Sequence, residues 1–223
     1  MNWRIGVAIA IAVVAVAMVF AWWFSSSSNA CAVLQTIDLG SGVRLQLVND
    51  ACKEGLPHTT DARTIRMTRG VWEGPRRDEI LRHERVHLTQ KGGLDAWRGF
   101  YRRVWEYECL AAAPAGVPVS LAARLRPNPD TADAPWALWR GRWLFFPVSL
   151  SEGALRDAEV VVWDVLAGRR VPIPAEWRAE FCEGAGGSRC PQQFEHPHEI
   201  SAEWLTTRSA VAPAAAKLFA WKQ

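Results

Sequence analysis

The distribution of hydrophobic positions divides this chain at about residue 30. Residues 5–24 form a run of twenty positions without a charged or strongly polar side chain, whereas hydrophobic and polar residues are mixed throughout the remainder. Twenty residues at a helical rise of about 1.5 Å match the roughly 30 Å hydrocarbon core of a bilayer. The pattern therefore predicts an N-terminal membrane anchor within residues 1–30 and one further domain over residues 31–223.

The residues flanking this run indicate how such an anchor would be oriented. Arg4 is the only charged residue before it, and tryptophans stand near both of its ends, at positions 3, 22 and 23. Positive charge favours the inner side of a membrane and indole rings favour its interface. We therefore expect a single-pass protein with its N-terminus inside and its C-terminal domain in a periplasmic, extracellular or lumenal space. The alternative is a cleaved signal peptide with its exit at residues 28–30.

Beyond residue 30 the hydrophobic pattern predicts one mixed α+β domain. Short alternating segments predict strands over 32–37, 43–48, 64–67 and 159–165, and a hairpin over 136–148. A helix is expected over 76–91, between Gly74-Pro75 and Gly92-Gly93, and a second over 94–112, stopped by Pro114. Pro174 and Pro197 each open another helix, and an alanine-rich segment closes the chain.

Composition and charge narrow the classes of partner. The chain has 26 basic and 23 acidic side chains and a formal net charge of +3, so its bulk charge gives no reason to expect nucleic acid. Arginines crowd residues 63–85, but acidic residues interleave with them, as is typical of a solvated helix face. A binder of polyanions is the alternative interpretation of this segment.

Five cysteines stand at spacings that contain no CxxC motif, which removes support for a cysteine-based zinc site or a thioredoxin-like site. A domain outside the membrane would meet an oxidising compartment, where disulfides persist. Cys182 and Cys190 bracket a glycine-rich loop, and Cys31 can pair with Cys52. Both disulfides are therefore expected.

The informative motif is HExxH, formed by His83, Glu84 and His87 within the first expected helix. Residues four apart lie on one face of a helix, so the two imidazoles can converge on one metal ion. The glutamate between them then stands beside the metal, where it can take a proton from an activated water. The motif predicts a zinc-dependent hydrolase with Glu84 as general base.

Catalytic zinc usually has three protein ligands, and no third histidine follows at the short spacing of the metzincins. The remaining option is a carboxylate from a later helix. Glu199 begins an ExxAE pattern that ends at Glu203, although it lies 112 positions beyond His87. Glu106 lies 19 positions beyond His87, and Glu108 is close to it, but neither has an acid four residues later. The sequence favours Glu199 and leaves all three open.

The HExxH and ExxAE segments together resemble the gluzincin metallopeptidases, and ExxAE is similar to the pattern in the catalytic domain of anthrax lethal factor. The resemblance covers about a tenth of the chain. It implies a single zincin-like domain that contains an HExxH helix and cleaves a peptide or protein substrate. It also implies that His83, His87 and Glu199 bind Zn²⁺ and that Glu203 orients a ligand histidine. We expect a Trp-rich β insertion to fill the long gap between His87 and Glu199. An oxyanion-stabilising donor is expected from Tyr101, Tyr107, His196 or His198.

A second hypothesis needs no catalysis. In that interpretation the chain is a membrane-anchored, non-enzymatic protein that keeps HExxH as a structural metal site or as a satisfied polar cluster in the core. Metal content alone does not separate the two hypotheses, because both accommodate a bound ion. Dependence of peptide hydrolysis on Glu84 does separate them.

Overall fold

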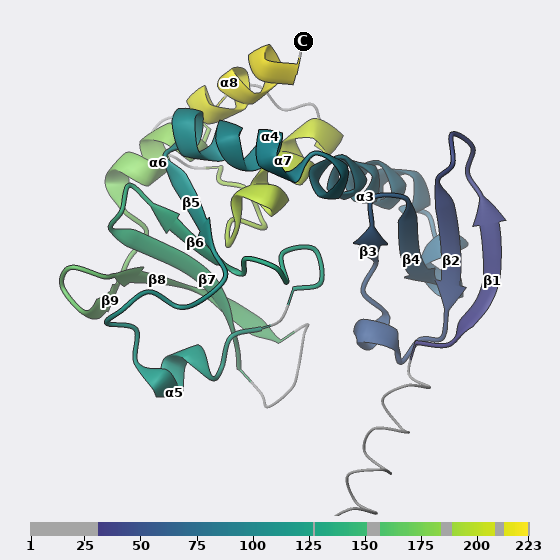
Figure 1. Ribbon diagram of the computed structural model, residues 1–223, viewed down its shortest axis with the longest axis horizontal. Helices are drawn as coiled ribbons and strands as arrows, with labels where there is room; N and C mark the ends of the chain where they lie inside the picture. The colour runs from purple at the N-terminus through teal and green to yellow at the C-terminus, as the bar shows by residue number, and fades with distance from the viewer. Residues whose placement is uncertain (1–30, 127, 151–156, 184–188, 208–211, 223) are drawn as a thin grey trace, which may run out of the picture.

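The computed structural model describes residues 31–126, 128–150, 157–183, 189–207 and 212–222. These residues form an α+β structure in which two β-sheets stand apart, with helices between and above them (Figure 1). The segment predicted as a membrane anchor lies outside the described residues.

The N-terminal sheet contains four strands, β1 (Val33–Asp38), β2 (Arg44–Val48), β3 (His58–Asp61) and β4 (Thr64–Thr68), in the order β1-β2-β4-β3. β2 and β4 are parallel, and the other two pairs are antiparallel. Two short helices, η1 (Cys52–Gly55) and α2 (Arg69–Trp72), accompany these strands. The sequence pattern did not predict β3, because its residues are mostly polar and show no apolar alternation. β3 forms the edge of the sheet and contacts α3.

Helix α3 (Arg77–Gly92) agrees with the first predicted helix to within a residue at each end. Asp78 and Glu79 lie in its first turn and Lys91 in its last, an arrangement that complements the helix dipole. Leu88 packs with the buried face of the N-terminal sheet, joined by the partly buried Ile80 and Leu81. The opposite face of α3 carries the HExxH residues and is directed toward the C-terminal part of the molecule.

The second predicted helix is much shorter than the sequence suggested. α4 spans Leu94–Phe100 and continues as one wide turn, η2 (Tyr101–Trp105), before the chain enters β5 (Tyr107–Leu110). Glu106 terminates the helix in a left-handed conformation with φ of 57°. Pairing of β5 with the next strand supplies hydrogen bonds that a longer exposed helix would have satisfied only locally, so tertiary context outweighs helix propensity here.

The C-terminal sheet is an antiparallel meander in the order β5-β6-β7-β8-β9. Its further strands are β6 (Trp136–Trp139), β7 (Trp143–Ser149), β8 (Ala158–Asp164) and β9 (Arg169–Val171), and these include the expected hairpin and the expected strand after it. The short helix α5 (Val119–Ala122) covers one face, where Leu121 and Leu125 pack against Phe146 and Trp136.

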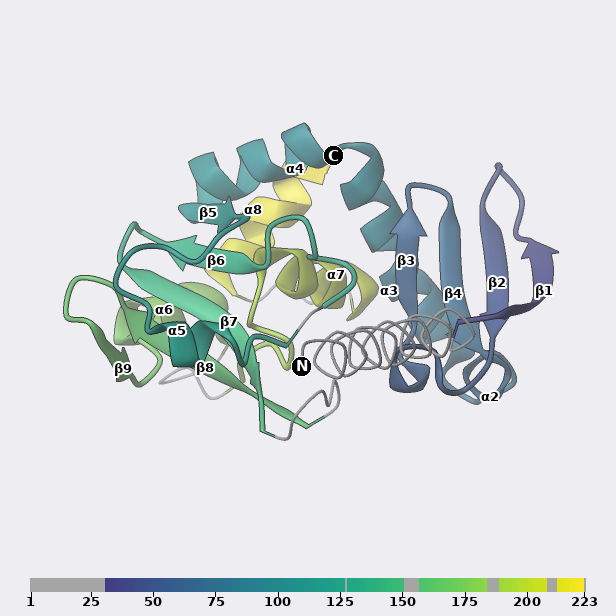
Figure 2. The same cartoon turned by 60° about the horizontal axis from the view of Figure 1, so that its bottom comes forward.

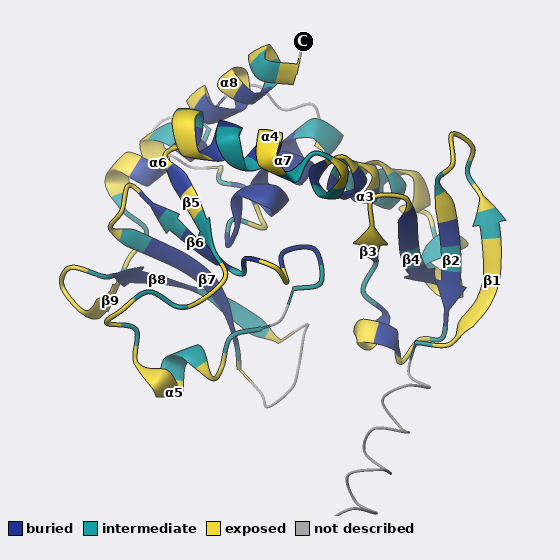
Figure 3. Cartoon of the chain, in the orientation of Figure 1, coloured by how far each residue is buried: buried dark blue, intermediate teal, exposed yellow. Residues whose placement is uncertain are grey.

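Three helices complete the structure, namely α6 (Ala175–Phe181), α7 (Pro197–Thr207) and α8 (Pro213–Lys222). Together with α4 they cover the other face of the C-terminal sheet (Figure 2). The core between them is aromatic, and Trp105, Trp139 and Trp177 are fully buried in it. Figure 3 shows this buried layer beneath helices whose outer faces are exposed. Most of the tryptophans in the described residues therefore serve packing.

The predicted fold class requires one correction, which concerns the transmembrane helix. Among the described residues, no helix is long and apolar enough to cross a membrane. The longest described helix, α3, has 16 residues and carries charges in every turn, whereas a span needs about 20 predominantly apolar residues. The run at residues 5–24 that prompted the prediction lies outside the described part of the chain.

Both expected disulfides are present. Cys31 is bonded to Cys52, which ties the start of β1 to η1, and Cys182 is bonded to Cys190 after α6. Cys109, on β5, is a free cysteine.

Candidate metal centre

The two histidines of the motif lie one turn apart on α3 and face the same way. His87 is 1% exposed and His83 is partly buried, and their Nε2 atoms are 3.0 Å apart. Their rings meet edge to face. The helix spacing therefore brings two imidazole nitrogens to one point, as the sequence predicted.

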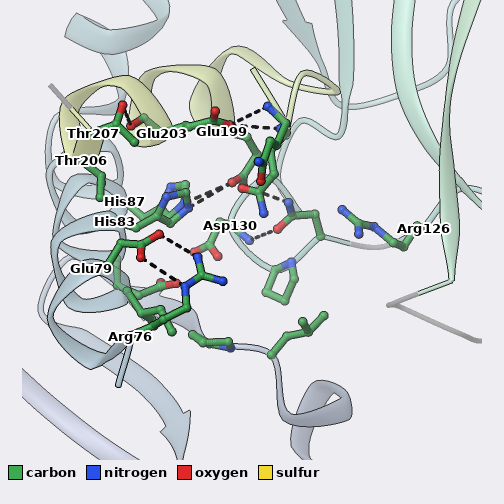
Figure 4. A pocket seen from close by; sticks show the side chains of 18 of the residues that line it. Arg76, Glu79, His83, His87, Arg126, Asp130, Glu199, Glu203, Thr206 and Thr207 are labelled. Carbon is green, nitrogen blue, oxygen red and sulfur yellow. Dashed lines mark hydrogen bonds and ion pairs between the residues drawn. The ribbon is translucent and has the colours of Figure 1, made fainter. Parts of the chain in front are cut away.

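Glu199 reaches the same point from α7. This helix begins at Pro197, so Glu199 lies in its first turn, where a carboxylate is favourable. Its Oε2 atom is 3.3 Å from His83 Nε2 and 3.4 Å from His87 Nε2. The three side chains converge between α3 and α7 (Figure 4), and their donor atoms all lie within 4.8 Å of one another.

The other two candidate ligands lie elsewhere. Glu106 is exposed and pairs with Arg140 at 2.8 Å, and Glu108 projects outward from β5. Both were expected on a helix that in fact ends at Trp105, so the premise for choosing them is wrong. The structure brings Glu199, and neither of these, to the histidines.

The donor set fits zinc. Two imidazole nitrogens and one carboxylate oxygen form a His₂Glu combination, which is one of the sets that catalytic zinc uses in proteins. All three groups are at least partly buried, and Glu199 is 3% exposed. Burial of a carboxylate between two imidazoles is costly unless a charge compensates it.

Side chains outside this trio hold it in place. The Asn128 side-chain amide donates to Glu199 Oε1 at 2.9 Å, and Gln90 bonds His87 Nδ1 at 2.6 Å. Glu203, which the resemblance implied as an orienter of histidine, instead accepts the backbone N–H groups of Gln192 and Gln193. Among the described residues no hydrogen bond joins Glu203 to either histidine. The carboxylate of Glu203 therefore binds the loop before α7.

Glu84 lies at the bottom of the same site. It is 4% exposed, and its Oε2 atom has no hydrogen-bond partner among the described residues. Burial raises the pKa of Glu84 well above its usual value, and the nearby charges of Asp130 and Glu199 raise it further. A carboxylate oxygen without a hydrogen-bond partner in a buried polar site is unusual in a folded protein, which makes Glu84 a candidate functional residue.

The ligand residues share one strongly coupled charge system. Burial lowers the pKa of His87, but the charges of Glu199 and Asp130 outweigh it and raise this pKa to about 10. Burial acts to raise the pKa of Glu199, and the two imidazoles outweigh it, so this pKa lies well below its usual value. From protein groups alone, the site therefore pairs a carboxylate with an imidazolium.

The site opens into a cleft of about 570 Å³. Its walls are mainly polar and charged, and Figure 4 shows Arg76 and Glu79 on the α3 side, Thr206 and Thr207 on α7, and Arg126 and Asp130 on the facing loop. Arg76 pairs with Glu79 at 2.7 Å. Polar and charged side chains of both signs therefore surround the histidines.

None of the four expected oxyanion donors lines this cleft. Tyr101 is buried against Ser201, and the Tyr107 hydroxyl accepts the Trp177 indole N–H at 2.6 Å. His196 bonds the backbone oxygen of Ala134, and the His198 side chain is 3% exposed. All four residues are buried and lie outside the lining of the cleft.

Sequence reasoning missed three residues of the site. Gln90 is three positions after His87 on α3, so its place on the same helix face was available from spacing alone. Asn128 and Asp130 belong to a loop marked only by its prolines, and nothing in that pattern placed it opposite α3. Asp130 accepts the backbone N–H of Thr59 at 3.0 Å and lies 3.7 Å from the Lys91 ammonium.

Comparisons of this chain with protein-family models, with curated proteins and with solved structures found no match.

Proposed function

We propose that this chain is a zinc-dependent metallopeptidase of gluzincin type. The observation that carries the proposal is the meeting of His83 Nε2, His87 Nε2 and Glu199 Oε2 beside the unpartnered Oε2 atom of Glu84. The third residue comes from a helix far along the chain, so the trio cannot be explained by helix spacing alone. A zinc donor set and an unpartnered carboxylate rarely meet in one cleft by chance.

His83, His87 and Glu199 would hold the ion. When bound, zinc supplies a Lewis acid that activates water and polarises a carbonyl group. Asn128 holds the Oε1 atom of Glu199, which leaves Oε2 directed at the histidines. The protein thus presents its three donor atoms already gathered, and little rearrangement is needed to receive the ion.

Glu84 would act as the general base. Its unpartnered Oε2 atom can accept the proton of the attacking water and later deliver it to the amine that leaves. Burial raises the pKa of Glu84, which makes this carboxylate a stronger base than an exposed glutamate. The negative charge of Asp130 contributes to the raised pKa of Glu84.

The cleft supports a peptide as the substrate class. Its walls come from α3, α7 and the loop around Asn128, and they are open and rich in hydrogen-bonding groups. A lipid substrate would require a mainly apolar lining, which this cleft lacks. A chain with regularly spaced amide groups matches such a surface better.

The test compares Glu84→Gln with wild type in zinc content and in hydrolysis of a broad peptide library. Glutamine keeps the shape of the side chain and removes the base, so zinc should stay stoichiometric and turnover should fall at least about a hundredfold. Glu108→Gln, an exposed carboxylate on β5, is the matched control and should behave as wild type. Stoichiometric zinc without any Glu84-dependent turnover would support the structural-site hypothesis instead.

A further inference from the structure

Gln90 connects the HExxH helix to the helix that carries Glu199. Its side chain is 1% exposed and bonds His87 Nδ1 at 2.6 Å on one side. On the other side its Nε2 atom is 3.0 Å from the backbone oxygen of His198, 2.9 Å from Ser201 Oγ and 3.3 Å from Tyr101 OH. One neutral side chain therefore spans α3, η2 and α7 directly behind the candidate ligands.

The backbone oxygen of His198 decides which way this amide points. A carbonyl oxygen only accepts hydrogen bonds, so the atom of Gln90 that faces it must be the NH₂ group. The remaining atom, Oε1, then faces His87. This orientation follows from the donor and acceptor chemistry of the neighbours and needs no assumption about the amide.

The hydroxyl groups agree with this orientation. Ser201 Oγ donates to the His198 carbonyl oxygen at 3.0 Å, which leaves its lone pairs to accept from Gln90 and from Tyr101 OH at 2.8 Å. Every polar atom of the network then has a partner of the correct type. A fully satisfied buried network is rigid and holds its members in one geometry.

The same logic fixes the tautomer of His87. Because Gln90 Oε1 is an acceptor, His87 Nδ1 must carry the proton that it donates. The lone pair of the neutral ring is then at Nε2, the atom that faces His83 and Glu199. The backbone oxygen of His198 on α7 thus determines, through Gln90, which nitrogen of His87 is offered to a metal ion.

We infer that Gln90 is the positioning residue of the metal centre: it selects the His87 tautomer that binds metal and locks that ring to the helix bearing Glu199. The inference rests on the proposed zinc site. It assigns to a neutral amide on α3 the role that the ExxAE resemblance gave to Glu203. Outer partners of metal-binding histidines commonly contribute about 10-fold to 100-fold in metal affinity.

The test measures Zn²⁺ affinity by chelator competition and records the ring nitrogens of His87 by ¹⁵N NMR. Gln90→Met keeps the length of the side chain and removes the acceptor, so affinity should fall about 10-fold to 100-fold. The NMR signal of the bonded Nδ1–H should also disappear. Gln90→Glu restores an acceptor for that proton but removes the NH₂ group that faces the His198 carbonyl oxygen, so it should keep the Nδ1–H signal and recover the affinity only in part. Gln35→Met, on the exposed face of β1, is the matched control and should change nothing.

The outcomes separate this inference from the peptidase proposal. Unchanged affinity and an unchanged Nδ1–H signal in Gln90→Met overturn the inference, whether or not peptides are cleaved. A Gln90-dependent affinity in a protein that cleaves no peptide supports the inference and overturns the peptidase proposal. Failure of the wild type to bind Zn²⁺ overturns both. Should Gln90→Met fail to fold, Gln90→Glu decides, since loss of the Nδ1–H signal in that variant overturns the inference.

Discussion

Binding of zinc should release a proton from His87. Burial acts to lower the pKa of this imidazole, but the negative charges of Glu199 and Asp130 outweigh it and raise the pKa to about 10. A ligand nitrogen must be unprotonated to bind a metal. Metal and proton therefore compete for the Nε2 atom of His87.

The number of protons that zinc displaces depends on how far the pKa of His87, about 10, lies above the ordinary imidazole value of 6.5. At about pH 7.5 an imidazole with a pKa of about 10 is almost fully protonated, whereas one with the ordinary value of 6.5 is only about one-tenth protonated. Glu199, whose pKa is lowered well below its usual value, is already ionised and releases nothing. Glu84 has a raised pKa and can add a proton of its own when a cation arrives nearby. The variant Glu84→Gln removes that second source.

The assay is titration calorimetry of the metal-free Glu84→Gln variant with Zn²⁺ in several buffers of different ionisation enthalpy. The slope of observed heat against ionisation enthalpy counts the protons released. We expect about one proton to be released at about pH 7.5. At pH values below the pKa of His87, the Zn²⁺ affinity should rise roughly tenfold for each unit by which the pH increases. A slope near one-tenth of a proton would refute the reasoning, because it would mean that His87 is neutral before the metal binds.

Three further predictions concern stability and ligand identity. The raised pKa of His87 stabilises the metal-free fold fully below about pH 6.5 and less as pH rises through about 10, so chemical unfolding should become easier over that interval. Glu199→Gln should reduce Zn²⁺ affinity by at least about a hundredfold, more than loss of an outer partner, whereas Glu106→Gln should leave it unchanged. Trp177→Ala should lower the free energy of unfolding by about 3 to 5 kcal/mol, since Trp177 is fully buried, while Leu166→Ala at an exposed position should change it by no more than about 0.5 kcal/mol.

The helix of the motif was predictable because its signals are local. Glycine and proline precede it, acids fill its first turn, and Gly93 follows its end. The segment after it was not predictable in the same way. Tyr107 and Cys109 alternate with Glu108, but their pairing partner, β6, lies almost thirty residues further on. A choice between helix and strand that depends on a distant partner cannot be made from the segment itself.

The residues of the candidate site also differ in whether local sequence signals predict them. His83, Glu84 and His87 are related by helix spacing, which the sequence displays directly. Glu199 was one of three open choices, because its approach to the histidines depends on how α7 packs against α3. The support given by Asn128 was invisible, since it belongs to a loop without a periodic pattern. Spacing within one element can be read from a sequence, and contacts between elements cannot.

The position of Glu199 is in turn fixed by the aromatic core. Trp204 lies on the same helix, buried, with its ring edge-on to Trp105 at 5.5 Å and stacked on Phe181 at 6.0 Å. Both of those residues belong to elements that cover the C-terminal sheet, so the sheet sets the place of α7 and α7 delivers the carboxylate. The N-terminal sheet sets the place of α3 in the same way. The candidate metal centre therefore lies where two separately built cores meet, which explains why one of its three donor residues lies so far along the chain from the other two.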